Sequence, residues 1–209
     1  NYLEILTHIG HSEKVLFMRI FLAVLVLIFS LQSWTKADEV EEFEIEGMSV
    51  GDSLLKFYSK DIIEDKKRFF FKNKKFFIFS IRIESDQYDA VQIQLKNNDP
   101  KYFIYAVEGK IMYEDKIDEC IIKKDEVFNE ILNFFEGKNF ETKSGKQKMK
   151  FDESGKSFDI GSELYFTTGG KIKVFCSDWS VEMKYVDNLK VSLVGKELRE
   201  WFNSGGPYK

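Results

Sequence analysis

The chain has 209 residues, of which 44% are hydrophobic and 16% aromatic, and its formal net charge is −4 at pH 7. A slightly acidic chain offers no global electrostatic reason to bind nucleic acid, so we expect no nucleic-acid partner. The two histidines, His8 and His11, lie near the start, so residues 38–209 contain none. This excludes Ser-His-Asp and Cys-His catalysis and removes the commonest metal ligand, and we predict no catalytic, cofactor-binding or metal-binding residue.

A hydrophobic segment near the start of the chain predicts where the protein works. One basic residue, Arg19, follows Met18 and precedes an uninterrupted apolar run over residues 20–29. A membrane-spanning helix needs about 20 apolar residues. The shorter run is typical of a secretory signal peptide, with a retained membrane anchor as the alternative.

The signal peptide divides the chain into three parts. We predict cleavage between Ala37 and Asp38, with a dispensable or untranslated leader at 1–17, the signal peptide at 18–37 and a single domain at 38–209. Residues before the cut carry three basic and two acidic side chains, which leaves a net charge of −5 on the 172 residues after it. We expect this domain to be periplasmic, without stable membrane insertion, and large enough for one hydrophobic core.

The first half of the domain predicts a helix followed by an antiparallel meander. Phe43 and Ile45 alternate with acidic residues, as in a short strand. Ser49 and Asp52 have the spacing of a capping box before a helix from Val50 to about Tyr58, which could resume at Asp61. Apolar runs and an Asn-Asn-Asp-Pro turn then predict three strands, at 76–83, 88–95 and 102–107, with residues 111–113 extending or following the third.

The second half predicts a helix and four more strands. The clearest amphipathic helix begins at Asp125 and ends before Gly137, with apolar residues repeating at intervals of three and four. Residues 138–155 are polar, lack periodicity and predict a long loop. Turn signals then separate two hairpins, with strands at 163–167, 171–176, 181–185 and 189–194, before a closing helix at 196–202.

Two groups of strands with a helix between them predict an α+β fold. We expect a mainly antiparallel sheet, made of two hairpin or meander groups, with two or three helices packed on one of its faces.

Two cysteines, Cys120 and Cys176, lie after the predicted cut. Two cysteines in an exported chain most simply form one disulfide, which would close a loop worth about 4 kcal/mol of stability. A redox pair is the alternative, although no Cys-x-x-Cys spacing supports it.

Two charged clusters are candidate binding sites. Asp152, Glu153, Asp159 and Glu163 lie around two glycines, and carboxylates of this kind suit calcium. The Asp-x-Asp-x-Asp-Gly pattern is absent, and a solvated loop is the alternative. Residues 66–75 mix lysine with phenylalanine and could contact single-stranded nucleic acid or anionic lipid, but acidic flanks and the export signal favour a solvated loop leading into a strand.

Aromatic residues gather on or beside the last strands of the domain. Tyr165, Trp179, Tyr185 and Trp201 could form a ligand groove or a partner-binding face. Packing in the core is the alternative, because aromatic side chains fit half-buried strands well.

Two resemblances bear on the fold and the address. Residues 43–55, FEIEGMSVGDSLL, and the domain as a whole resemble small exported proteins of unknown function from marine bacteria with AT-rich genomes, a family without an assigned activity. The segment GMSVGDSL, at 47–54, is similar to the BamE/SmpA-like outer-membrane assembly proteins over about a third of the chain. The lipid-bearing cysteine and the Gly-x-Pro of that family are absent here, so this resemblance implies topology rather than membrane tethering.

These observations lead to one expected function and two alternatives. We expect an exported, non-enzymatic protein that binds an envelope protein, because an open strand edge can recruit an extended partner. The alternatives are a soluble binder of a small molecule or cell-wall fragment, and a hydrolase that uses two carboxylates with separated pKa values.

Overall fold

A computed structural model describes residues 39–114 and 116–206 of the chain. The predicted leader, the signal peptide and the cut between Ala37 and Asp38 lie outside these residues. The described residues belong to one compact unit.

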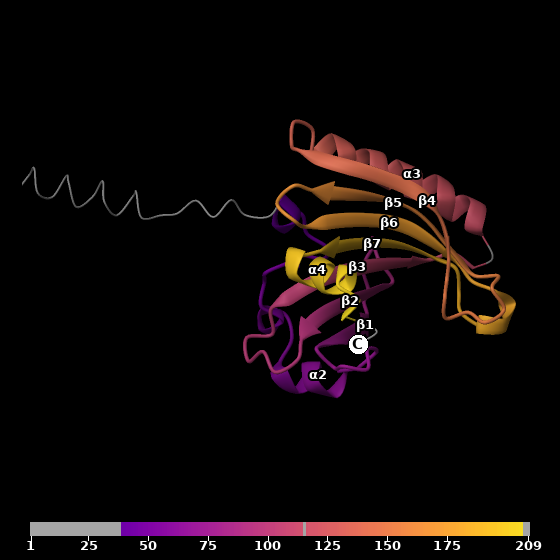
Figure 1. Ribbon diagram of the computed structural model, residues 1–209. Helices are drawn as coiled ribbons and strands as arrows, with labels where there is room; N and C mark the ends of the chain where they lie inside the picture. Colours follow the sequence, from indigo (N-terminus) through magenta and orange to yellow (C-terminus); the bar gives the residue numbers. More distant parts are fainter. Residues whose placement is uncertain (1–38, 115, 207–209) are drawn as a thin grey trace, which may run out of the picture. The chain divides into compact units, whose positions relative to one another are not determined.

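A single sheet of seven antiparallel strands forms the centre of the domain (Figure 1). The strands lie in the order β1-β2-β3-β7-β6-β5-β4, so two meanders meet where β3 pairs with β7. The predicted α+β fold with a mainly antiparallel sheet is therefore confirmed. The strands span Phe76–Arg82 (β1), Ala90–Lys96 (β2), Ile104–Met112 (β3), Phe140–Lys148 (β4), Phe158–Phe166 (β5), Lys171–Asp178 (β6) and Asn188–Val194 (β7).

The two longer helices, α3 (Ile117–Phe134) and α4 (Lys196–Asn203), lie on opposite faces of this sheet. The α3 helix packs on β5, β6 and β7 and contributes to the larger core. Leu198 and Trp201 of α4 pack instead against Ala106 and Val194 on the other face. The prediction that the helices share one face is wrong, because Phe76, Ala106 and Val194 form a second apolar cluster on the other face, which needs a cover of its own.

Four shorter elements complete the described chain. They are the 3₁₀ turns η1 (Glu39–Glu42), η2 (Leu54–Lys56) and η3 (Val181–Met183), and the short helix α2 (Lys60–Asp65).

The predicted helix from Val50 to Tyr58 does not form, because its backbone pairs with the start of β3. Gly51 donates its N–H to the carbonyl of Ile104 and Leu54 donates to that of Tyr102, both at 2.9 Å. These long-range bonds leave only η2 and, after a break, α2. Tertiary pairing has overridden local helix propensity here.

The predicted capping box is half present. The Asp52 carboxylate accepts the backbone N–H of Ser49 at 3.1 Å, whereas the Ser49 hydroxyl donates to the carbonyl of Phe43 at 2.8 Å. The short strand predicted at Phe43 and Ile45 reduces to one isolated bridge between Ile45 and Met48.

The α3 helix begins at Ile117, eight residues before the predicted start at Asp125. Its buried stripe runs from Cys120 through Lys124 to Phe128. Lysine at the middle position hides the helical repeat, because a charged residue is rarely buried.

Two corrections concern the second meander. The segment predicted as a loop at 138–155 contains β4, which pairs with β5 along its whole length. The strand predicted at 181–185 is instead the 3₁₀ turn η3, so β6 pairs directly with β7 across a longer connection.

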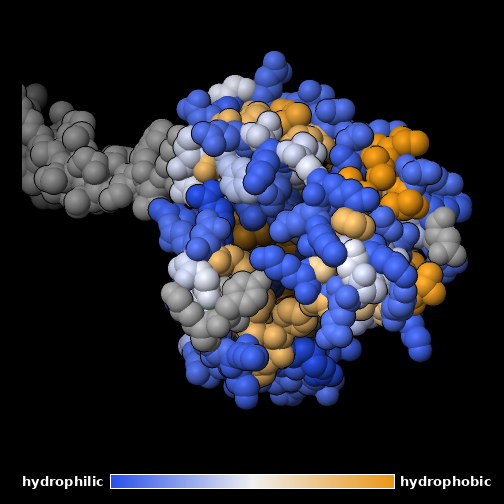
Figure 2. Space-filling view, turned by 45° about the vertical axis from the view of Figure 1, so that its right-hand side comes forward, coloured by the Kyte–Doolittle hydropathy of each residue, from blue (hydrophilic) through white to orange (hydrophobic). Residues whose placement is uncertain are grey.

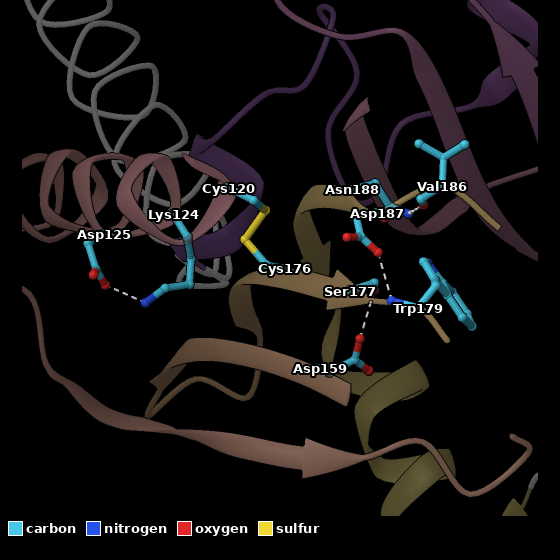
Figure 3. Close-up of a disulfide and its surroundings, with 10 residues drawn as sticks. All are labelled: Cys120, Lys124, Asp125, Asp159, Cys176, Ser177, Trp179, Val186, Asp187 and Asn188. Atoms are coloured by element: carbon cyan, nitrogen blue, oxygen red, sulfur yellow. Dashed lines mark hydrogen bonds and ion pairs between the residues drawn. A yellow bond between two sulfur atoms is a disulfide. The ribbon is translucent and has the colours of Figure 1, made fainter. Parts of the chain in front are cut away.

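The predicted disulfide is confirmed: Cys120 on α3 is bonded to Cys176 on β6 (Figure 3). Both residues are fully buried. Because they are 56 positions apart, the bond attaches the helix that follows the first meander to the centre of the second.

Candidate functional site

The outer edge of β4 is the most accessible edge of the sheet. Among residues 39–114 and 116–206, no strand lies beyond β4 in the sheet order. Its first residue, Phe140, is half-buried, and the eight that follow are all exposed. The opposite edge strand, β1, is partly covered, because Arg68 and Ile78 exchange two backbone hydrogen bonds of 2.9 and 2.8 Å.

The hydrogen-bonding groups of β4 point alternately toward β5 and away from it. Met149, just past the strand, donates its N–H to the carbonyl of Ser157 at 3.0 Å, and the pairing then runs along β4 without a register shift. In an antiparallel pair, this alternation directs the N–H and C=O of even-numbered residues such as Thr142, Ser144 and Lys146 outward. Those groups match the ladder of a further strand.

The side chains of β4 make this edge basic. Lys143, Lys146 and Lys148 outweigh its single acid, Glu141, and give the strand a formal charge of +2. None of the three ammonium groups has a carboxylate within 4.0 Å among the described residues. The Lys146 ammonium lies 4.1 Å from the ring centroid of Phe158, which still leaves its charge uncompensated.

A hollow of about 330 Å³ lies beside this edge, and we call it the β4 hollow. Figure 2 shows one face of the molecule, which is mostly hydrophilic with smaller apolar patches. The β4 hollow is lined by side chains and backbone of three neighbouring strands, β4, β5 and β6. Its lining residues are Lys143, Ser144, Gly145, Lys146, Gln147, Asp159, Gly161, Ser162, Glu163, Lys173 and Phe175.

Glu163, on the wall of the β4 hollow, is held by three neighbours. Tyr165 donates its hydroxyl to the carboxylate, and the ammonium groups of Lys171 and Lys173 lie 3.2 and 3.5 Å from it. Burial, together with the bond to Glu163, raises the pKa of Tyr165 to about 12, while burial lowers the pKa of Lys171. These groups satisfy one another, so Glu163 is a structural carboxylate.

A second carboxylate, Glu108, lies on the same face nearer the centre of the sheet. It accepts a 2.6 Å hydrogen bond from Ser192, and Lys110 lies 3.4 Å away. Burial alone would raise the pKa of Glu108, but the charges of Lys190 and Lys110 reverse the shift and lower it. Glu108 is therefore ionised at neutral pH and compensated by its surroundings.

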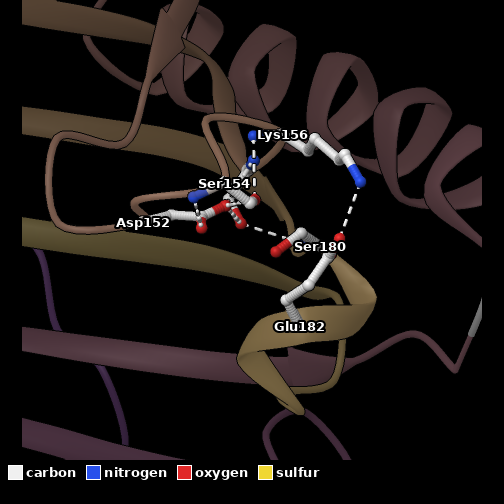
Figure 4. A network of polar contacts seen from close by, with 6 residues as sticks. Asp152, Ser154, Lys156, Ser180 and Glu182 are labelled. Atoms are coloured by element: carbon white, nitrogen blue, oxygen red, sulfur yellow. Dashed lines mark hydrogen bonds and ion pairs between the residues drawn. The ribbon is translucent and has the colours of Figure 1, made fainter.

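A polar network joins two loops at one end of the sheet, residues 149–157 between β4 and β5 and residues 179–187 between β6 and β7 (Figure 4). The buried Asp152 carboxylate accepts bonds from the N–H and hydroxyl of Ser154, at 2.9 Å each, and from those of Ser157, at 2.9 and 2.6 Å. Ser157 in turn accepts the N–H of Ser180 at 2.9 Å. The bonds from Ser157, followed by those from Ser154, hold the pKa of Asp152 well below its usual range, so this acid fixes the loops in place.

The four aromatic residues predicted as a binding surface do not form one surface. Trp179 and Tyr185 pack edge to face with ring centroids 4.8 Å apart. Trp201 is buried on the inner side of α4 against other rings, and the ring centroid of Tyr165 lies 5.8 Å from the guanidinium carbon of Arg199. A shared role in binding for all four stays a prediction.

The acids considered for calcium are also dispersed. Asp159 accepts the hydroxyl of Ser177 at 2.7 Å, while Asp152 and Glu163 belong to the separate networks above. Within the described ranges, no group of three or more His, Cys, Asp or Glu side chains is placed to hold a metal ion.

The basic stretch at 66–75 forms a loop that enters β1. Lys67 places its ammonium 4.4 Å from the ring centroid of Phe77, and Phe71 packs edge to face on Trp201 at 4.9 Å. Phe69 and Phe70 are exposed, with 41% and 70% of their surfaces accessible. In the part of the chain that the structure describes, no helix has both the length and the apolar character needed to cross a membrane.

Sequence reasoning missed the candidate site because it assigned β4 to a loop. One signal could have located the strand. The residues Asp152-Glu153-Ser154-Gly155 are typical of a turn, and the segment before this turn is long enough to pair with the strand predicted after it. Comparisons of the chain with protein-family models, with curated proteins and with solved structures found no match in any of the three.

Proposed function

We propose that this is a non-enzymatic binding protein that captures an extended, acidic segment of another envelope protein by adding it to the sheet outside β4. The observation that carries the proposal is the outer edge of β4, a nine-residue strand whose last eight residues are exposed and which has no neighbouring strand on that side among the described residues. Backbone hydrogen bonds to such an edge supply affinity, and alternate side chains supply specificity.

The charge of β4 selects the partner. Lysine on an edge strand discourages pairing between like edges, and two copies of β4 placed edge to edge would each bring a formal charge of +2. An acidic segment would instead be attracted to this edge, because its carboxylates would neutralise the charges of Lys143, Lys146 and Lys148. The same residues thus oppose self-association and favour an acidic partner.

The described carboxylates favour binding over hydrolysis. A general acid in a carboxylate pair needs a raised pKa. Six carboxyl groups of the described residues have a pKa held below its ordinary value: Asp52, Glu64, Glu108, Asp152, Glu163 and Glu182. Each of them is stabilised as an anion, so none is suited to donating a proton near neutral pH.

The envelope address rests on the predicted signal peptide. The buried Cys120–Cys176 disulfide supports it, because such bonds persist in oxidising compartments and are rare in the cytosol.

The proposal is tested with labelled nine-residue peptides and fluorescence anisotropy. We expect a peptide rich in Glu, Val and Thr to bind about tenfold more tightly than its counterpart with Lys in place of Glu, from several cross-strand charge pairs. Raising the salt concentration should weaken it. Two N-methylated versions, modified on odd or on even residues, test strand addition itself, because only one set of N–H groups faces β4.

A variant locates the site. Lys146→Glu should lower the affinity of the protein for the acidic peptide. Lys101→Glu, on the turn between β2 and β3, should leave this affinity unchanged. Equal binding of both N-methylated peptides, or of the Glu and Lys peptides, would show that strand addition at β4 is wrong.

A further inference from the structure

Two glycines lie opposite each other on β4 and β5, on the face of the sheet that points away from α3. Gly145 pairs with Gly161, and Gly161 pairs in turn with Phe175 on β6. Paired residues project to the same face of a sheet, so this row leaves a channel where two side chains would otherwise stand. The channel is the floor of the β4 hollow.

The β4 hollow is open at the strand edge and closed at its inner end. A Cβ atom added to Gly145 would meet nothing within 4 Å. One added to Gly161 would lie 2.4 Å from the Cβ of Phe175, so the phenylalanine already covers the inner glycine. An aromatic side chain opposite a glycine compensates for its missing packing. Gly145, on the edge, has no such cover among the described residues.

The walls of the β4 hollow come from the rows on either side of the glycines. Lys143 pairs with Glu163 on one side, and Gln147 pairs with Asp159 on the other. Both acids already accept hydrogen bonds from within the sheet. The groups left for a ligand are the Lys143 ammonium, the Gln147 amide and the apolar end wall.

The alternation of hydrogen bonds fixes what would lie opposite Gly145. The N–H and C=O of Gly145 point toward β5, so an antiparallel strand added outside β4 would meet it as a non-hydrogen-bonded pair. Such pairs have the closest Cα atoms, about 4.5 Å apart, and the closest side chains. The partner residue at this position therefore projects directly into the open end of the β4 hollow.

We propose that the captured segment runs antiparallel to β4 and places an aromatic side chain opposite Gly145, in the β4 hollow. This inference rests on the proposed function and names its specificity. The ring would cover Gly145 as Phe175 covers Gly161. If the aromatic residue is position 0, the same register puts position +2 opposite Lys143, position −1 opposite Lys146 and position −3 opposite Lys148. The recognised sequence is thus acid-x-acid-aromatic-x-acid.

Three synthetic peptides of this pattern test the inference. The first carries Phe at position 0, the second carries Ala there, and the third has the composition of the first with Phe moved to +1, which would place the ring on the other face. We expect the first to bind the wild-type protein about tenfold more tightly than the other two, because only its ring is buried.

A variant fills the β4 hollow without straining the chain. Gly145→Val adds a side chain where space is open, at a φ outside the left-handed region, and valine suits a strand. It should remove the preference for Phe over Ala. Thr142→Val is the matched control, because it changes an equally exposed β4 residue on the opposite face and should keep the preference.

The outcomes separate this inference from the proposed function. Equal and tight binding of all three acidic peptides would support strand addition and overturn the role of the β4 hollow. A preference for Phe that survives Gly145→Val would also overturn it. Failure of every acidic peptide to bind would overturn both, and the wild-type peptide series gives this answer even if Gly145→Val does not fold.

Discussion

Breaking the Cys120–Cys176 disulfide should cost this domain a large part of its stability. The bond joins residues 56 positions apart, and constraining an unfolded chain over that length contributes about 4 kcal/mol. For a domain of this size, each kcal/mol moves the melting temperature by about 2–4 °C, so reduction should lower it by about 8–16 °C. Reduction leaves both sulfur atoms in the core, so the change measures the covalent link rather than lost packing.

The assay is urea unfolding followed by tryptophan fluorescence, with and without reductant. A Cys120→Ala/Cys176→Ala variant serves as the control, because its unfolding should not respond to reductant. A reductant effect below about 1 kcal/mol on the wild-type protein would refute the reasoning. The packing of α3 on β5, β6 and β7 would then hold the helix in place without help from the bond.

Three further predictions concern single side chains. Asp152→Asn should be less stable than the wild-type protein at pH 7 and should lose less stability below about pH 4. A carboxylate whose pKa is lowered in the folded state stabilises the fold only above its unfolded-state pKa. Identical pH profiles of unfolding for the two proteins would contradict this. Trp201→Ala should cost about 3–5 kcal/mol in urea unfolding, since this α4 residue buries its ring against the sheet, and a cost below 1 kcal/mol would mean that the ring does not hold α4 in place. Gly161→Ala should cost about 1–3 kcal/mol of stability through its clash with Phe175, whereas Gly145→Ala should be nearly neutral. Equal costs in thermal unfolding would mean that the β4 hollow is not closed at Gly161 and open at Gly145.

Sequence patterns located the elements whose burial is one-sided. In β2, Val91, Ile93 and Leu95 are buried and alternate with half-buried residues, and the predicted boundaries differ by at most two residues from the observed ones. The closing helix α4 was predicted for the same reason, since its apolar residues lie on one face. The disulfide followed from residue count and expected compartment rather than from any local pattern.

The errors arose where distant contacts decide the local structure. The segment from Val50 to Tyr58 has the residues of a capped helix, but hydrogen bonds to Tyr102 and Ile104 draw its backbone toward β3. The start of α3 was missed because Lys124 is buried with its ammonium bonded to Asp125, an arrangement that no hydrophobic repeat can indicate. Neither contact is readable from the residues nearby in the chain.

The missed strand β4 differs from these errors, because its missing sequence signal and its proposed role have the same physical cause. Periodicity identifies a strand only when one face is buried, and all of β4 beyond Phe140 is exposed. A strand without a buried face is held mainly by its hydrogen bonds to β5, so its side chains need not satisfy the core. Lysines can then occupy both faces and glycine can stand at the centre. Such residues weaken any sequence prediction of a strand, and they are also the ones that would let an acidic, aromatic-bearing segment pair with this edge.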